Sequence, residues 1–80
     1  MTVKLVFLGK LADLAGAPEK EVAGPLDWQA LLDALPDPLA EVARGEKVKL
    51  ALNGTVLADK ASLSAQDGDE VALLPPVSGG

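Results

Sequence analysis

The residues whose types and spacing most clearly suggest a chemical function lie at the end of the chain, which reads VALLPPVSGG from Val71 to Gly80. Pro75 and Pro76 fix φ and lack amide donors, so they should end a strand and stiffen the exit from the domain. Ser78-Gly79-Gly80 has almost no side-chain bulk, which suits passage through a narrow channel. Fully extended, residues 75–80 reach about 20 Å. The pattern predicts an arm that enters the active site of another protein.

The reactive group of such an arm is the carboxylate of Gly80. Its pKa, ordinarily about 3.3–3.7, leaves it ionised and unreactive near neutral pH. It must be activated, for instance as an acyl adenylate, before it can react. A Gly-Gly ending also occurs by chance, and it becomes informative here because a stiff Pro-Pro segment precedes it.

Other kinds of chemistry are limited by the residues that the chain lacks. It contains no Cys and no His, which excludes disulfides, zinc-finger spacings, thiol nucleophiles, imidazole bases and haem ligation. The run Asp67-Gly68-Asp69-Glu70 could suggest a calcium loop, but the spacing and the further ligands of that loop are missing. A plain turn is favoured, and no metal site is expected.

The charge pattern narrows the class of partner. The net charge is −5, the basic residues are scattered, and the only aromatic residues are Phe7 and Trp28. This composition is poorly suited to nucleic acids. It suits either docking to a basic protein surface or solubility alone. No apolar run is long enough to span a membrane, and the opening MTVKLVF lacks a signal-peptide pattern, so no membrane partner is expected and the predicted location is cytoplasmic.

Hydrophobic periodicity predicts one α+β domain over residues 1–74, followed by the tail at 75–80. The first two strands should form an antiparallel pair, and Asn53-Gly54 predicts a tight hairpin turn later in the chain. A mixed sheet with one main helix across it is the economical packing. The predicted strands are 3–8, 19–23, 47–52, 55–57 and 70–74, and a short helical segment is expected around 10–14.

The main helix is predicted after Asp27, whose carboxylate should cap the free amides of the first turn. Pro36 should end this helix. Asp37-Pro38 predicts the start of a second helical segment, with Asp37 as its cap and Pro38 as its first helical residue. The apolar stripe of the first segment is Trp28, Leu31, Leu32 and Leu35, and the second continues it through Leu39, Val42 and Ala43.

One pattern does not fit a free-standing domain. If Val3, Leu5 and Phe7 face the helix, Val6 and Leu8 point away from it. In the last strand, Val71 and Leu73 can face the helix, so Ala72 and Leu74 lie on the open side. If the two strands are neighbours, an exposed apolar patch results, and we interpret it as a partner surface. A covering loop, or a register shifted by one residue, would remove it. The predicted interface residues are Val6, Leu8, Ala72 and Leu74.

The segment LSAQDGDEVALLPPVSGG, Leu63 to Gly80, resembles the end of the molybdopterin synthase small subunit, the MoaD-type sulfur carrier. The similarity covers the whole chain, including the KLVFLGKLADLAG opening, the Leu-rich central helix and the ALNGTVL hairpin. Its specific part is the DGDEV…PPVSGG pattern. The resemblance implies a ubiquitin-like β-grasp fold, with a mixed five-stranded sheet and one main helix packed across it.

The resemblance also implies a function. Gly80 would be adenylated by an E1-like adenylating enzyme that uses ATP, and then converted to a thiocarboxylate with sulfur from a donor protein. That sulfur would pass to cyclic pyranopterin monophosphate on the molybdopterin synthase large subunit, in a heterotetramer. Two transfers would build the dithiolene that holds molybdenum. The chain would be a non-catalytic sulfur-donor subunit that binds no cofactor itself.

The resemblance places the apolar patch against the large subunit and the tail in its active site. Related chains often carry an aromatic residue at the positions of Leu8 and Leu74, so a less aromatic docking surface is expected. A carrier for thiazole synthesis or tRNA thiolation, a ubiquitin-like modifier of protein lysines, and an interaction module with an inert tail remain as alternatives. The inserted residues would be Pro75, Pro76, Val77, Ser78, Gly79 and Gly80.

Overall fold

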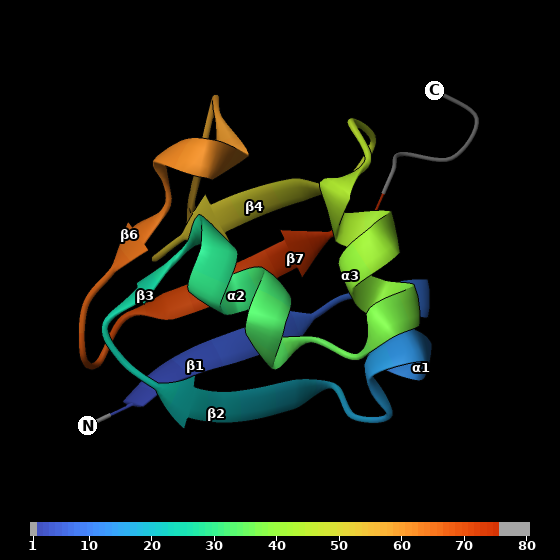
Figure 1. The fold of residues 1–80 in the computed structure, drawn as a ribbon, viewed down its shortest axis with the longest axis horizontal. Helices are drawn as coiled ribbons and strands as arrows, with labels where there is room; N and C mark the ends of the chain where they lie inside the picture. The colour runs from blue at the N-terminus through green and yellow to red at the C-terminus, as the bar shows by residue number, and fades with distance from the viewer. Residues whose placement is uncertain (1, 76–80) are drawn as a thin grey trace.

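A mixed five-stranded sheet forms the framework of the molecule (Figure 1). The computed structural model describes residues 2–75, so the predictions made for residues 76–80 lie outside the described residues. The strand order is β2-β1-β7-β4-β5, and β1 and β7 run parallel while the other neighbours are antiparallel. The strands are β1 (Thr2–Phe7), β2 (Glu19–Ala23), β4 (Lys49–Leu52), β5 (Thr55–Val56) and β7 (Glu70–Leu74).

The predicted strand pairings are confirmed. The first two strands form an antiparallel pair, and the first and last strands are neighbours, with Val6 opposite Ala72. The β4–β5 turn has positive φ at both Asn53 (51°) and Gly54 (88°), which is the conformation that favours Asn-Gly in tight hairpins. In the strand order given above, β7 lies in the middle of the sheet, between β1 and β4.

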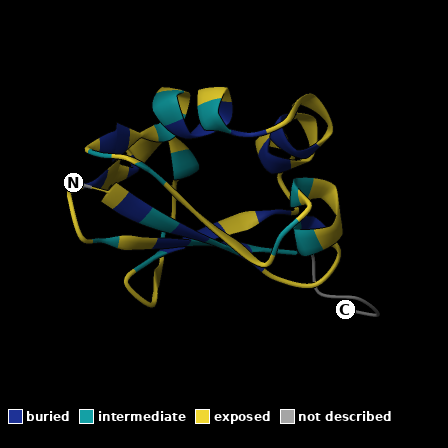
Figure 2. Ribbon diagram, turned by 90° about the horizontal axis from the view of Figure 1, so that it is seen from below, coloured by how far each residue is buried: buried dark blue, intermediate teal, exposed yellow. Residues whose placement is uncertain are grey.

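The helices lie on one side of the sheet, and no helix of residues 2–75 covers the opposite face (Figure 2). They are α1 (Lys10–Ala15), α2 (Trp28–Ala34) and α3 (Asp37–Arg44). The predicted cap of α2 is confirmed, because Asp27 Oδ1 accepts a hydrogen bond from the Ala30 amide at 2.8 Å. As predicted, Pro36 separates this helix from a second one. The two helices have 7 and 8 residues, so neither is a single main helix.

Two details of the α3 prediction were wrong. Asp37 is not the cap but the first helical residue, and Pro36 occupies the cap position with φ −60° and ψ 151°. Proline already has the extended conformation that a cap needs, so the helix begins one residue earlier. Its buried face then consists of Leu39, Ala40 and Ala43, while Val42 is 38% exposed.

The core lies between the sheet and the helices, on the face that alternation predicted. Val3, Leu5 and Phe7 of β1 are buried, as are Val71 and Leu73 of β7. The helices and the residue that caps the end of α2, Leu35, contribute chiefly leucines: Leu11, Leu31, Leu32, Leu35 and Leu39.

Three small elements were not predicted. β3 (Leu26–Asp27) and β6 (Ser64–Ala65) form a second, two-stranded sheet, and η1 (Lys60–Ser62) is a single 3-10 turn. Segments of two or three residues are too short to show a hydrophobic period, so nothing in the local pattern reveals them.

Candidate functional site

The face of the sheet opposite the helices carries a row of apolar side chains across four strands. Val6 of β1 lies opposite Ala72 of β7, and Ala72 lies opposite Ala51 of β4. Ala51 in turn lies opposite Val56 of β5. Paired residues of neighbouring strands project from the same face, so these four form one continuous row.

The predicted interface residues all belong to this face or its margin. Val6, Ala72 and Leu74 are half-buried, and Leu8, one residue beyond β1, is 42% exposed. The Leu8 amide donates to the Leu73 carbonyl at 3.3 Å, which holds Leu8 beside the end of β7. An apolar surface left open in this way usually marks a contact with a partner. We define the outer patch as Val6, Leu8, Ala51, Val56, Ala72 and Leu74.

Ala51 and Val56 were missed by sequence reasoning. Val56 is 56% exposed, the most exposed large apolar side chain of residues 2–75. Ala51 is buried but does not belong to the core cluster, because its neighbour Leu50 takes the inward position. Alternation with Leu50 could have placed Ala51 on the outer face, but only the pairing of β4 with β7 shows that it joins the patch.

Charged residues flank the outer patch on two sides. On the β2 side, Glu19 lies opposite Val6, and its carboxylate is 3.4 Å from the Lys4 ammonium. On the other side, Lys49 lies opposite Leu74, at the margin of the sheet, and its side chain also lines a depression on the helix side. Exposed ion pairs of this kind add little stability, but charges at a sheet edge disfavour unspecific strand pairing. The margin of the patch is thus polar and its centre apolar, as in protein interfaces.

The tail leaves the sheet next to this patch. Pro75, the last described residue, follows directly on the central strand β7 and is half-buried. Its ring lies against Gly9, since a Cβ added at Gly9 would be 3.3 Å from Pro75 Cγ. The predicted reactive group on Gly80 and the inserted residues Pro76 to Gly79 lie outside the described residues. The structure therefore describes the base of the arm and its surroundings.

The Asp67-Gly68-Asp69 segment is a turn with a structural role. Asp69 Oδ2 accepts from the Gln66 amide at 2.8 Å, and Asp69 Oδ1 accepts from Asn53 Nδ2 at 3.0 Å. These hydrogen bonds from Gln66 and Asn53 hold the pKa of Asp69 below its ordinary value. Within residues 2–75, no group of His, Cys, Asp or Glu is arranged to hold a metal ion. The carboxylate instead ties the β4–β5 turn to the start of β7.

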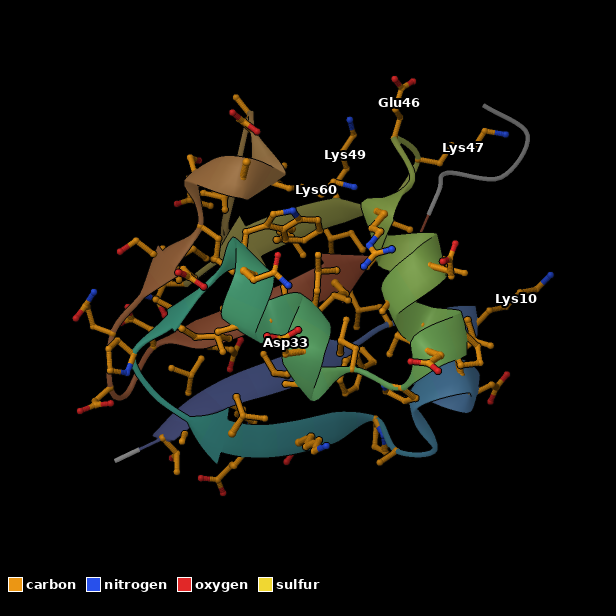
Figure 3. The ribbon with its side chains drawn as sticks, viewed as in Figure 1. Lys10, Asp33, Glu46, Lys47, Lys49 and Lys60 are labelled. Atoms are coloured by element: carbon orange, nitrogen blue, oxygen red, sulfur yellow. The ribbon has the colours of Figure 1, made fainter. Side chains whose placement is uncertain are left out.

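A second cluster surrounds Lys60 on the helix side, beside an open depression of about 450 Å³. The Lys60 ammonium donates to the Ala43 carbonyl at 2.6 Å and lies 5.5 Å from the centre of the Trp28 ring. Burial lowers the pKa of Lys60, and the positive charge of Lys49 lowers it further. Figure 3 shows Glu46, Lys47 and Lys49 projecting outward near the start of β4. Lys60 thus satisfies a carbonyl at the end of α3.

No helix of residues 2–75 is both long enough and apolar enough to cross a membrane. The described residues thus present an apolar patch on the open face of the sheet, next to Pro75 at the end of β7.

The fold and sequence match known proteins over nearly the whole chain. The model of the ThiS family matches residues 5–80. The chain is 28% identical to small archaeal modifier protein 1 (SAMP1) of Haloferax volcanii, with full coverage of both chains and a TM-score of 0.73. It is 26% identical to a putative molybdopterin converting factor, subunit 1, of Pyrococcus furiosus, over 96% of this chain and 99% of that one, with a TM-score of 0.72.

A third match is a chain in the complex of subunits 1 and 2 of the molybdopterin-converting factor of Helicobacter pylori. The identity is 25%, both chains are fully covered, and the TM-score is 0.61. The architecture shared with these structures is the β-grasp, a mixed five-stranded sheet with helices on one face. The predicted fold class is thereby confirmed.

Proposed function

Because the chain belongs to the ThiS family, whose model matches residues 5–80, we propose that it is a sulfur carrier, and specifically the sulfur-donor subunit of molybdopterin synthase. The main observation behind the proposal is that the outer patch lies next to the point where the C-terminal segment leaves the sheet, and that this segment ends in Gly-Gly. Two of the similar structures are named as molybdopterin-converting factor subunits, which supports this pathway.

The chemistry begins at the Gly80 carboxylate. On an E1-like adenylating enzyme, a carboxylate oxygen attacks the α-phosphorus of ATP and pyrophosphate leaves, which gives an acyl adenylate. A sulfur nucleophile at the oxidation level of sulfide, delivered by a donor protein, then displaces AMP from the acyl carbon. The product is a thiocarboxylate on Gly80, with sulfur in place of one carboxylate oxygen.

The thiocarboxylate is then the nucleophile of the synthase reaction. Its sulfur attacks a side-chain carbon of cyclic pyranopterin monophosphate as an oxygen substituent leaves that carbon. Water then hydrolyses the resulting thioester, which returns the Gly80 carboxylate and leaves the sulfur on the pterin side chain. Two such transfers build the dithiolene. Docking raises the effective concentration of the sulfur because it makes the reaction intramolecular. The glycines beside the reacting atom leave it sterically unhindered.

The large subunit supplies the remaining groups. The chain contains no His, and its tail has no ionisable side chain to act as a general acid or base. The outer patch docks on the large subunit, in a heterotetramer, and the arm from Pro75 onward enters that subunit's active site. ATP is bound by the adenylating enzyme and not by this chain.

Intact-mass spectrometry tests the proposal directly. The purified chain is incubated with an E1-like adenylating enzyme, ATP and a sulfur donor, and an oxygen-to-sulfur mass increase on Gly80 is expected. The thiocarboxylated product is then mixed with the molybdopterin synthase large subunit and cyclic pyranopterin monophosphate, and with acceptors of the thiazole and tRNA pathways in parallel. Transfer to either of the other acceptors, and none to the pterin, would overturn the pathway assignment.

The likeness to small archaeal modifier protein 1 favours a second candidate function, that of a ubiquitin-like protein modifier. The same acyl adenylate would then be transferred to a lysine amine and form an isopeptide bond. Mass spectrometry of digested cell extract decides this point. Because Lys60 is the last basic residue, tryptic digestion would leave residues 61–80 on a modified lysine. This remnant, joined through Gly80 to lysines of other proteins, would establish modification, and its absence alongside thiocarboxylated chain would restrict the chain to sulfur transfer.

A further inference from the structure

The corner that joins β1 to α1 is unusually constrained. Gly9 has φ 57° and ψ −134°, a backbone conformation that residues with a side chain rarely adopt. The first turn of α1 holds the corner on one side, because the Leu8 and Gly9 carbonyls accept from the Leu11 and Ala12 amides, each at 3.1 Å. On the other side, the Leu8 amide donates to the β7 carbonyl of Leu73. The corner is thus fixed to both the helix and the central strand.

This corner is the surface on which Pro75 rests. A Cβ added at Gly9 would lie 3.3 Å from Cγ and 3.9 Å from Cβ of the Pro75 ring. The first distance is shorter than ordinary van der Waals contact, so a side chain at position 9 would push the ring away by a few tenths of an ångström. The ring of proline also closes onto its own backbone nitrogen. A ring held in place therefore holds the direction of the chain at Pro75.

We propose that Gly9 is a positioning residue for sulfur transfer, because its bare backbone seats the Pro75 ring and thereby aims the C-terminal arm. The proposal rests on the function proposed above. Five residues can span about 16 Å when extended, so the direction of the chain at Pro75 influences which part of a partner the chain end can reach. A displacement of only about 1 Å at a reacting centre can cost about 100-fold in rate. Aim at the base of the arm is therefore decisive for delivery.

Two variants control for this idea. Gly16, at the other end of α1, also has a positive φ of 81°, but a Cβ added there meets nothing within 4 Å. Gly16→Ala tests a positive φ without a contact, although Gly16 has the left-handed helical conformation and Gly9, at φ 57° and ψ −134°, does not. The Pro75→Ala background separates the contact from backbone strain at position 9, because the strain remains there while the ring is absent.

The first readout is single-turnover sulfur transfer from the thiocarboxylated chain at saturating large subunit, where the rate constant does not depend on affinity. We expect a decrease of about tenfold or more in Gly9→Ala and a change of less than about twofold in Gly16→Ala. In a Pro75→Ala background, adding Gly9→Ala should change the rate no further, because the ring that it displaces is gone. A Gly9→Ala effect that persists in full in that background would overturn the proposal.

The second readout follows the arm without any chemistry. The chain has no Cys, so Ser78→Cys provides one attachment point for a nitroxide label. The label broadens the NMR signals of nearby amides. Broadening in α1 or around β4 therefore reports the direction of the arm. The broadening pattern should change in Gly9→Ala and Pro75→Ala and stay unchanged in Gly16→Ala. An unchanged pattern in Gly9→Ala would refute the role of Gly9, whereas failure of the unaltered carrier to deliver sulfur would refute the proposed function instead.

Discussion

The outer patch makes a quantitative prediction for binding of the large subunit. Leu8 and Val56 lie at opposite sides of the patch and are 42% and 56% exposed. Truncation to Ala removes three and two methylene equivalents, each contributing about 0.8 kcal/mol when fully buried. Scaled by the exposed fractions, which is the area still available for docking, Leu8→Ala and Val56→Ala each cost about 1 kcal/mol of binding free energy.

Because the two positions are far apart in the patch, their effects should add. The double variant Leu8→Ala/Val56→Ala is expected to bind the large subunit about 25-fold more weakly, from about 2 kcal/mol. Isothermal titration calorimetry measures the dissociation constant. By the same arithmetic the buried fractions of the two side chains contribute about 2 kcal/mol to folding, so thermal denaturation should show a lowered melting temperature with the variant still folded at the temperature of the titration.

The helix side of the molecule supplies the control. Leu14 of α1 and Val42 of α3 are 40% and 38% exposed, so Leu14→Ala/Val42→Ala removes the same kinds of side chain at similar exposure. This variant should bind the large subunit as tightly as the unaltered chain. If both double variants lost affinity equally, or if only the helix-side variant did, the outer patch could not be the docking surface.

Three further predictions concern the tail, a helix cap and an acidic turn. Deletion of Gly79-Gly80 should abolish thiocarboxylate formation in the intact-mass assay while the melting temperature stays unchanged; a large fall in melting temperature would show that the tail supports its own domain. Asp27→Ala removes the hydrogen bond to the Ala30 amide and should cost about 1 kcal/mol of unfolding free energy, or about 4–8 °C in calorimetry, with sulfur transfer retained; Gln29→Ala, on the exposed face of α2, is the control. The lowered pKa of Asp69 means that its carboxylate stabilises the fold above the unfolded-state pKa and that this contribution disappears as pH falls through the folded-state value. Urea denaturation across acidic pH should therefore show Asp69→Asn less stable at neutral pH and the difference shrinking on acidification; a constant difference would mean that the charge plays no part.

Much of the fold could be predicted because its signals are local. Alternation in β1 and β7, the Asn53-Gly54 turn and the Asp27 cap each depend on residues that are neighbours in the chain. The α3 start was misplaced because Pro36 and Asp37 are both good residues for a helix beginning, and only backbone geometry decides between them. The two-residue strands β3 and β6 depend on a pairing across the chain that no local period encodes.

The candidate site was predicted in part for the same reason. Val6, Leu8, Ala72 and Leu74 follow from alternation within two strands and one assumption about their pairing. Ala51 and Val56 required the further pairings of β4 with β7 and with β5. The contact between Gly9 and Pro75 joins residues from opposite ends of the chain. A glycine that follows a strand reads as an ordinary strand ending, so the sequence alone does not reveal this contact.

The central position of β7 has a consequence for how the molecule folds. Its parallel pairing with β1 joins segments separated by almost the entire described chain, and such distant pairings form slowly. The β1–β2 and β4–β5 hairpins are local and can form first, but β1 and β4 each keep an unpaired edge until β7 enters between them. Substitutions that weaken β7 would thus expose two strand edges at once, and these are the sites at which partly folded chains would aggregate.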